Sequence, residues 1–135
     1  MITAVDTSVL LDVLLDDPRF SRPSVAALES ASALGRLVVC PVVWAEVRAA
    51  LKEPAKIGAL LSKAGIEFDP FDEVSAEHAG DLWRAYRSAG GKREHLITDF
   101  LVGAHAAKRA ARLLARDRGF FRKHFAHLTV VEPSR

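Results

Sequence analysis

Apolar and polar positions along the chain follow two patterns that alternate from one end to the other. Short runs of consecutive apolar residues predict buried strands. We expect these strands at residues 2–5, 37–40, 66–68, 113–116 and 128–131. Apolar residues at intervals of three and four predict amphipathic helices between the strands. We expect these helices over 8–15, 22–34, 43–52, 54–63, 75–89 and 98–109. Continuous apolar strands separated by helices indicate an α/β fold, with a parallel sheet covered on both faces.

Turn residues mark the ends of two of these helices. Pro23 fits the first turn of the helix that ends before Gly35. Backbone N–H groups in a first turn have no partner within the helix, so the missing N–H of proline costs no hydrogen bond there. Ser75 is expected to cap the helix that ends at the pair Gly90 and Gly91. The boundaries of both helices follow from these residues.

Length and composition are those of one ordinary domain. With 135 residues, of which 50% are hydrophobic, the chain can bury a core, and we expect a single domain over residues 1–135. The lone Cys40 excludes an intrachain disulfide and fits a reducing compartment. The first residues are uncharged and Asp6 interrupts the apolar start, unlike a signal peptide, and no run of about 18 apolar residues occurs. We therefore expect a cytoplasmic protein without a membrane span.

Charge is distributed unevenly, although the net charge is only +2. Residues 1–83 contain 7 Lys and Arg against 13 Asp and Glu, a net of −6, whereas residues 84–127 contain 11 against 3, a net of +8. A basic surface attracts an anionic polymer such as a nucleic acid. An equally open interpretation is that these residues solvate the outer faces of helices.

Acidic residues occupy positions that meet at one edge of the expected sheet. Asp6 follows the first strand and Asp117 follows the fourth. Because the carboxyl ends of parallel strands share an edge, where such sheets bind ligands, we expect both carboxylates there. Glu46 lies on or beside the apolar face of the helix 43–52. Asp99, near the start of the helix 98–109, adds a fourth carboxylate at the inner edge of the fold.

Each acid also has a simpler interpretation. Asp6 and Asp117 can begin turns, and Asp99 can be a first-turn acid that favours a helix N-terminus. Glu46 can pair with Arg48. Clustered carboxylates, however, repel one another unless a cation neutralises them, so their convergence favours a cation site. Oxygen ligands without Cys or His select a hard ion, Mg²⁺ or Mn²⁺.

Four segments of the chain resemble, in order and spacing, the four motifs of PIN-domain ribonucleases, especially the VapC-type toxins of bacterial toxin–antitoxin pairs. These segments are AVDTSVLLDVL, PVVWAEVRAAL, ITDFLVGAHAA and LLARDRGFFRKHF. The resemblance covers essentially the whole chain. It implies an α/β/α sandwich whose five parallel strands lie in the order 3-2-1-4-5, and a metal-dependent endoribonuclease activity.

The resemblance also implies the roles of the acids. By position it makes Asp6, Glu46, Asp99 and Asp117 an acidic quartet. Hydrolysis of an RNA phosphodiester requires an activated water and stabilisation of the developing charge, which Mg²⁺ or Mn²⁺ held by carboxylates supplies. We expect Asp6 and Asp99 to hold the main ion, and Glu46 and Asp117 to complete its shell or orient the attacking water.

Neighbouring residues are expected to assist the acids. Ser8, two residues after Asp6, is expected to cap a helix with Thr7, or else to hydrogen-bond a carboxylate or a metal-bound water. Arg118 is expected to face phosphate. Arg116 is a second phosphate candidate, with the alternative that it extends outward from the strand.

Histidines and aromatic residues near the C-terminus favour packing roles. His105 is expected to be a core or surface histidine and not a ligand. Phe120, Phe121 and Phe125 are expected in the core, with stacking on RNA bases as the alternative.

The resemblance further implies the partners: an RNA substrate such as tRNA or rRNA, a cognate VapB-like antitoxin, and a second copy in a homodimer. Two other functions stay open. One is a phosphoryl-transfer site on a similar sheet, which needs a lysine near the late strands, where LLARDRG offers arginine. The other is a non-catalytic PIN-fold module that binds nucleic acid or protein and in which the acids are dispensable.

Overall fold

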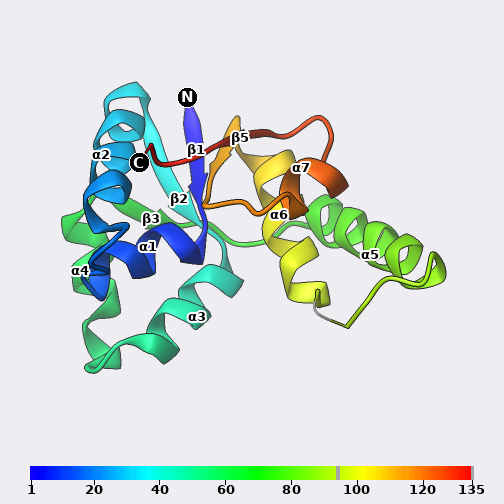
Figure 1. Cartoon of the computed structure of the whole chain (residues 1–135), viewed down its shortest axis with the longest axis horizontal. Helices are drawn as coiled ribbons and strands as arrows, with labels where there is room; N and C mark the ends of the chain where they lie inside the picture. Colours follow the sequence, from blue (N-terminus) through cyan, green and yellow to red (C-terminus); the bar gives the residue numbers. More distant parts are fainter. Residues whose placement is uncertain (94, 135) are drawn as a thin grey trace.

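Five parallel strands form the centre of the computed structural model, which describes residues 1–93 and 95–134. They are β1 (Ile2–Val5), β2 (Arg36–Val39), β3 (Ile66–Phe68), β4 (Arg112–Leu114) and β5 (Thr129–Val131). Their order in the sheet is β3-β2-β1-β4-β5, and all four strand pairs are parallel (Figure 1). The expected strand order is confirmed.

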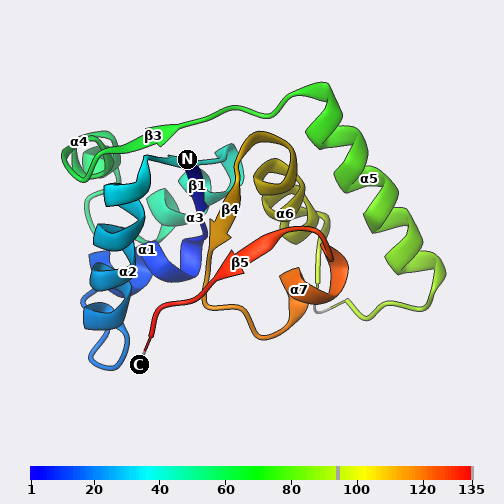
Figure 2. The same ribbon diagram turned by 90° about the horizontal axis from the view of Figure 1, so that it is seen from above.

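Helices cover both faces of this sheet. They are α1 (Thr7–Leu14), α2 (Ser21–Leu34), α3 (Pro41–Ala50), α4 (Ile57–Lys63), α5 (Glu73–Ser88), α6 (Ile97–Arg109) and α7 (Phe120–His124), with a 3₁₀ turn at Pro54–Lys56. In Figure 2 the sheet runs between α1, α2 and α4 on one side and α5, α6 and α7 on the other. The expected α/β/α arrangement is therefore confirmed. No described helix is long and apolar enough to cross a membrane.

The hydrophobic core lies on both faces of the central strands. Val5 in β1 and Val38 and Val39 in β2 are at most 1% exposed, as the continuous apolar runs predicted. From the helices, Val9 and Phe100 are completely buried against them. Burial of side chains of this size stabilises the fold by roughly 1.5–3 kcal/mol each. The core therefore holds the ends of β1 and α6, where candidate acids lie, in fixed positions.

Most element boundaries differ from the predictions by one to three residues, and two of these differences have a clear cause. α5 begins at Glu73 and not at Ser75, because the Asp72 carboxylate accepts the backbone N–H of Ser75 at 2.8 Å and caps the helix earlier. β4 ends at Leu114, because the backbone N–H of Arg116 donates to the Ser8 hydroxyl and not to a strand. The short helix α7 was not predicted, because five residues are too few for an apolar period to show.

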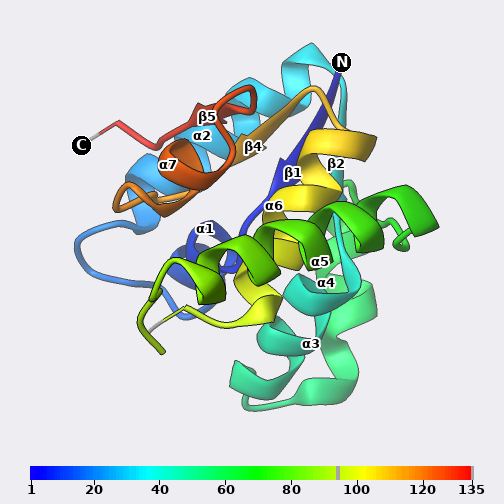
Figure 3. The same ribbon diagram turned by 90° about the vertical axis from the view of Figure 1, so that its right-hand side faces the viewer.

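The carboxyl edge of β1 is where several helices meet. α3 lies below the ends of the strands in Figure 1 and contacts both α1 and α6. α5 packs along α6, as Figure 3 shows from the side. Side chains from β1, α1, α3 and α6 are therefore near one another at this edge, although their residues are far apart in the sequence.

Candidate active site

Asp6 lies at the junction of β1 and α1. Its backbone N–H donates to the carbonyl of Leu114 at 2.9 Å, which continues the pairing of β1 with β4 by one residue. Its carboxylate caps α1 by accepting the backbone N–H of Ser8 at 3.3 Å and the Ser8 hydroxyl at 2.7 Å. The helix cap is thus Asp6 itself, not Thr7 or Ser8. Sheet pairing and capping together fix this carboxylate at the sheet edge.

Glu46 is joined to the start of α1. Its Oε1 atom accepts the hydroxyl of Thr7 at 2.9 Å. Arg48, the ion-pair partner considered from the sequence, instead donates to the carbonyl of Pro54 at 3.1 Å. The Thr7 contact links α3 to the residue that follows Asp6, so it fixes Glu46 near the start of α1.

Asp99 is the third residue of α6. Its Oδ2 atom accepts the backbone N–H of Leu96 at 2.8 Å. Asp99 therefore caps its helix as a first-turn acid, which was the simpler interpretation. The ring of His95 lies close, with 3.9 Å between its Nδ1 atom and Asp99 Oδ2. The capping role leaves the second carboxylate oxygen of Asp99 available for other contacts.

Electrostatics tie these three acids together. Burial raises the pKa of Asp6 above its ordinary value, hydrogen bonds from Ser8 oppose this, and the charge of Asp99 raises it further. Burial also raises the pKa of Glu46, against the hydrogen bond from Thr7, and repulsion from Asp6 and Asp99 adds to the rise. The charge of Asp99 therefore acts on both Asp6 and Glu46, and that of Asp6 acts on Glu46, so a bound cation would relieve this repulsion.

Asp117 is placed differently from the other three. Its carboxylate accepts the backbone N–H groups of Gly119, Phe121 and Arg122 at 3.0 to 3.1 Å, and its side chain is only 1% exposed. It follows β4 as predicted, but these bonds cap the first turn of α7. A role at the metal site would have to coexist with these three bonds or replace some of them.

Ser8 connects Asp6 to the end of β4. Its hydroxyl donates to Asp6 and accepts the backbone N–H of Arg116 at 3.1 Å. The prediction that Ser8 hydrogen-bonds a carboxylate is confirmed by this contact. Ser8 thereby joins Asp6, which follows β1, to the segment that follows β4.

Arg116 forms an internal ion pair and does not point outward. Its Nε and Nη2 atoms donate to both oxygens of the Asp12 carboxylate at 2.7 and 2.8 Å. Asp12 is 3% exposed and also accepts the hydroxyl of Ser24. The guanidinium of Arg116 lies 4.0 Å from the ring centroid of Phe20. Because every strong contact of this guanidinium is internal, we leave Arg116 out of the phosphate-binding set.

Internal ion pairs also engage other parts of the basic half of the chain. Arg109 donates to both oxygens of Asp69 and to Asp72, and the buried His105 contacts Asp69 at 2.8 Å. His105 is therefore a core histidine, as predicted. Arg118, by contrast, is exposed and pairs with no acid in the described part of the chain.

The donor set fits a hard divalent cation by its chemistry. Asp6, Glu46 and Asp99 offer carboxylate oxygens, with the hydroxyls of Ser8 and Thr7 beside the first two, and oxygen ligands are the ones that Mg²⁺ and Mn²⁺ prefer. Among residues 1–93 and 95–134, no three acidic, histidine or cysteine side chains already stand at distances that surround an ion. The carboxylates of Asp6, Glu46 and Asp99 accept hydrogen bonds from Ser8, Thr7 and Leu96, respectively.

Comparison with known protein families decides what this arrangement belongs to. The family model of the PIN domain matches residues 3–126. The chain belongs to the PIN domain family. The match spans all four candidate acids, so the resemblance seen in the sequence is confirmed at the level of the family. No curated protein matches the chain.

Solved structures share the PIN fold over the whole chain. A chain of VapBC2 from Rickettsia felis, bound to a DNA fragment from its promoter, is 17% identical with a TM-score of 0.76, over 99% of this chain and 100% of that one. A chain of VapBC-1 from nontypeable Haemophilus influenzae is 20% identical with a TM-score of 0.76, over 100% of both. A chain of a toxin–antitoxin complex from Klebsiella pneumoniae is 23% identical with a TM-score of 0.67, over 98% of both.

Two features of this PIN domain site were missed from the sequence. The hydrogen bond from Thr7 to Glu46 joins residues 39 positions apart, and no local pattern reports such a contact. The buried pair of Asp12 and Arg116 did leave a signal, because Asp12 lies on the apolar face of its helix between Val9 and Val13. An acid at such a position needs a partner.

Proposed function

We propose that this PIN domain protein is a VapC-type toxin, a metal-dependent endoribonuclease that hydrolyses RNA phosphodiester bonds. The observation that carries the proposal is the placement of Asp6, Glu46 and Asp99, from three separate elements, at the carboxyl edge of the sheet in a PIN fold. This edge is where parallel α/β sheets bind their ligands. Mutual repulsion of these acids further supports a cation as part of the site.

Each of the three acids has a role in this proposal. Asp6 and Asp99 would hold a divalent ion, Mg²⁺ or Mn²⁺, and Glu46 would complete the set or accept a proton from the attacking water. The ion supplies charge stabilisation at the phosphate and a water of lowered pKa. Thr7 and Ser8 orient Glu46 and Asp6 through their hydroxyls, which limits the orientations open to the two carboxylates.

Residues after β4 complete the proposed site. Asp117 shapes the turn between β4 and α7 through its three backbone hydrogen bonds. The exposed Arg118 lies on that turn, and we propose that it binds a phosphate of the RNA. Asp117 is thus assigned a positioning role, and a ligand role is the alternative that its variants test.

The proposed partners follow from the structural relatives. The chain matches whole chains from VapBC and toxin–antitoxin complexes, which supports a VapB-like antitoxin that neutralises the activity. A homodimer is proposed on the same resemblance. Co-purification with the product of the adjacent reading frame, followed by light scattering, measures both assemblies.

Cleavage of RNA by the purified, antitoxin-free protein tests the proposed activity. Total RNA and tRNA are incubated with Mg²⁺ or Mn²⁺, with EDTA, and with the variants Asp99→Asn and Asp6→Asn. Asparagine keeps an oxygen that accepts the capping bonds but removes the negative charge, so folding is preserved while the proposed metal site is lost. Asp81→Asn, which changes an exposed acid of α5, is the matched control.

The expected result is cleavage that needs the metal, persists in Asp81→Asn and falls at least about 100-fold in both site variants, comparable to the loss of one strong charge-stabilising group. Cleavage that survives Asp99→Asn and Asp6→Asn places the activity elsewhere and contradicts the assigned site. A folded protein that cleaves neither RNA pool favours the non-catalytic binding module.

A further inference from the structure

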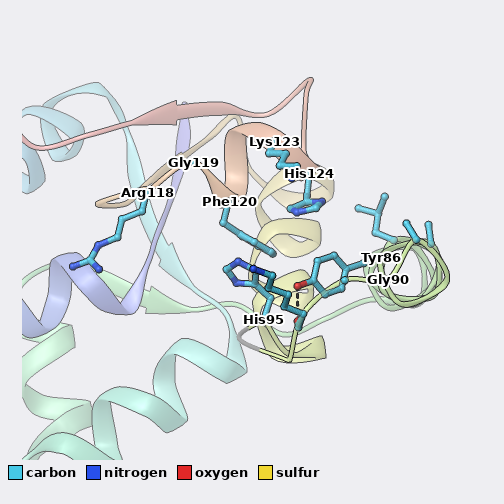
Figure 4. A pocket seen from close by; sticks show the side chains of 13 residues that line it. Tyr86, Gly90, His95, Arg118, Gly119, Phe120, Lys123 and His124 are labelled. Atoms are coloured by element: carbon cyan, nitrogen blue, oxygen red, sulfur yellow. Dashed lines mark hydrogen bonds between the residues drawn. The ribbon is translucent and has the colours of Figure 1, made fainter.

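A pocket of about 750 Å³ lies between the end of α5, the segment before α6 and the helix α7. Its volume falls within the roughly 300–1,000 Å³ that is common for sites of small organic groups. Figure 4 shows the rings of Tyr86, His95, Phe120 and His124 turned toward one another around it. The pocket is separate from the three candidate acids, and the proposed catalytic roles leave it without a function.

The aromatic rings that line this pocket pack against a buried ring, that of Phe100. Phe100, which is completely buried, lies 5.1 to 5.4 Å by ring centroids from Phe120, Tyr86 and His124. Phe120 and His124 are themselves 4.9 Å apart. Because the buried ring fixes the half-buried ones, their remaining faces form a preorganised aromatic platform.

A glycine builds one wall of the pocket. A Cβ atom added at Gly91 would lie 2.5 Å from atoms of the Tyr86 ring, so only glycine lets the backbone pass so close. The Tyr86 hydroxyl donates to the carbonyl of Lys92, which fastens the same segment. The close approach of Gly91 and the hydrogen bond of Lys92 therefore fix the backbone beside the Tyr86 ring.

Cationic side chains line the pocket together with the rings. Lys92, Lys123 and Arg118 are all lining residues, and Arg118 extends away from the four rings in Figure 4. Aromatic faces beside a cationic rim are the combination with which proteins bind single-stranded nucleic acid, the rings taking bases and the cations taking phosphates. An apolar ligand would leave these charges unused.

His95 places the pocket next to the candidate active site. Its ring lines the pocket, lies 4.4 Å by ring centroids from Phe120 at an interplanar angle of 39°, and has its Nδ1 atom 3.9 Å from the Asp99 carboxylate. Burial lowers the pKa of His124, and the charge of Lys123 lowers it further, which favours the uncharged ring.

We infer that this pocket receives one unpaired nucleobase of the RNA substrate, stacked on Phe120 and His124, so that the adjoining phosphate reaches Asp99. The inference rests on the proposed ribonuclease function and adds the requirement that the substrate be single-stranded beside the cut. It also makes the platform, and not the acids, the part of the site that recognises bases.

Binding of short RNA without metal tests the pocket separately from cleavage. Fluorescently labelled hexaribonucleotides of A, C, G or U, and a hexamer of abasic ribose phosphates with the same charge, are titrated in EDTA by fluorescence anisotropy. Wild-type protein is expected to bind at least one base-containing hexamer about 5- to 100-fold more tightly than the abasic one, the range expected for stacking of a base on an aromatic side chain.

Variants of two pocket residues test which side chain causes the preference for bases. His124→Leu keeps apolar packing but removes the ring, and should abolish most of the preference for bases, whereas His124→Phe should retain it. Lys123→Ala should weaken all hexamers by a similar factor, because it removes a phosphate contact. His127→Leu, an exposed histidine outside the pocket, is the matched control, and circular dichroism checks the fold of each variant.

Three outcomes overturn the inference: equal binding of abasic and base-containing hexamers, an unchanged preference in His124→Leu, or no binding of any hexamer. The metal-dependent cleavage assay decides the proposed function independently. Cleavage without base-dependent binding refutes the nucleobase pocket and supports the proposed nuclease function. Base-dependent binding without any cleavage refutes the nuclease function and supports the pocket as a nucleobase site.

Discussion

Replacing Arg116 by methionine is expected to destabilise the protein strongly, because it removes the cation from a buried carboxylate. Asp12 is 3% exposed, and its two oxygens accept hydrogen bonds from Arg116 and from the Ser24 hydroxyl. Methionine has a similar length and packs well, so the substitution removes charge and hydrogen bonds more than it removes volume.

The size of the effect follows from these contacts. Removing one partner of a buried ion pair costs about 3–5 kcal/mol. The Arg116 side chain is 27% exposed, so water reaches the pair from one side, and the lower end of this range applies. Loss of the contact with Phe20 adds about 0.5–1 kcal/mol. We expect the free energy of unfolding to fall by about 3.5–4 kcal/mol, which lowers Tm by roughly 12–14 °C in a domain of this size.

A double-mutant cycle with Asp12→Asn measures the pair itself. Asparagine still accepts the Ser24 hydroxyl but has no charge, so Arg116→Met should cost about 2 kcal/mol less in the Asp12→Asn background. Urea unfolding followed by circular dichroism gives each free energy. Arg118→Met, two residues further along and exposed, is the control and should change stability by no more than about 0.5 kcal/mol.

The opposite result would refute this reasoning. If Arg116→Met leaves the urea midpoint unchanged and weakens the binding of RNA, then Arg116 contacts phosphate, as one interpretation of the sequence had it. A loss of stability that is the same with Asp12 and with asparagine at that position would show that packing, and not the ion pair, accounts for the effect.

Two further predictions concern other carboxylates. Asp117→Ala should lower the free energy of unfolding by about 1–2 kcal/mol. Asp117→Asn should lose less than Asp117→Ala, because its amide oxygen still accepts the N–H groups of Gly119 and Phe121, although its NH2 group cannot accept that of Arg122. A loss of cleavage in Asp117→Asn as large as in Asp99→Asn would make Asp117 a metal ligand. Hydrogen bonds from Arg109 lower the pKa of Asp69, and hydrogen bonds from Ser75 and Arg109 lower that of Asp72 to about 2. These carboxylates stabilise the folded state above their unfolded pKa of about 4, and that stability is lost as the pH falls toward about 2. In urea titrations across this range, Arg109→Met should show a shallower decline than wild type, and an equal decline would show that Arg109 does not stabilise these charges.

The sequence by itself determined the class of fold and the positions of the acids. The continuous apolar runs of β1 and β2 predict buried parallel strands, because a strand covered on both faces has no polar side to show. An acid that directly follows such a strand lies at the sheet edge whatever its side chain contacts. For this reason the place of Asp6, directly after β1, was predictable, and that of Asp117, three residues after β4, was predictable to within one turn.

Only the tertiary structure decided which partner each charged side chain has. Asp117 turns into the first turn of α7, and Arg116 reaches Asp12 across 104 positions of the sequence. The aromatic pocket likewise joins α5, the segment before α6, and α7. Sequence patterns report the period and burial of a segment, which depend on residues close along the chain. Partners, pockets and helices as short as α7 depend on how distant segments pack, and no local pattern carries that information.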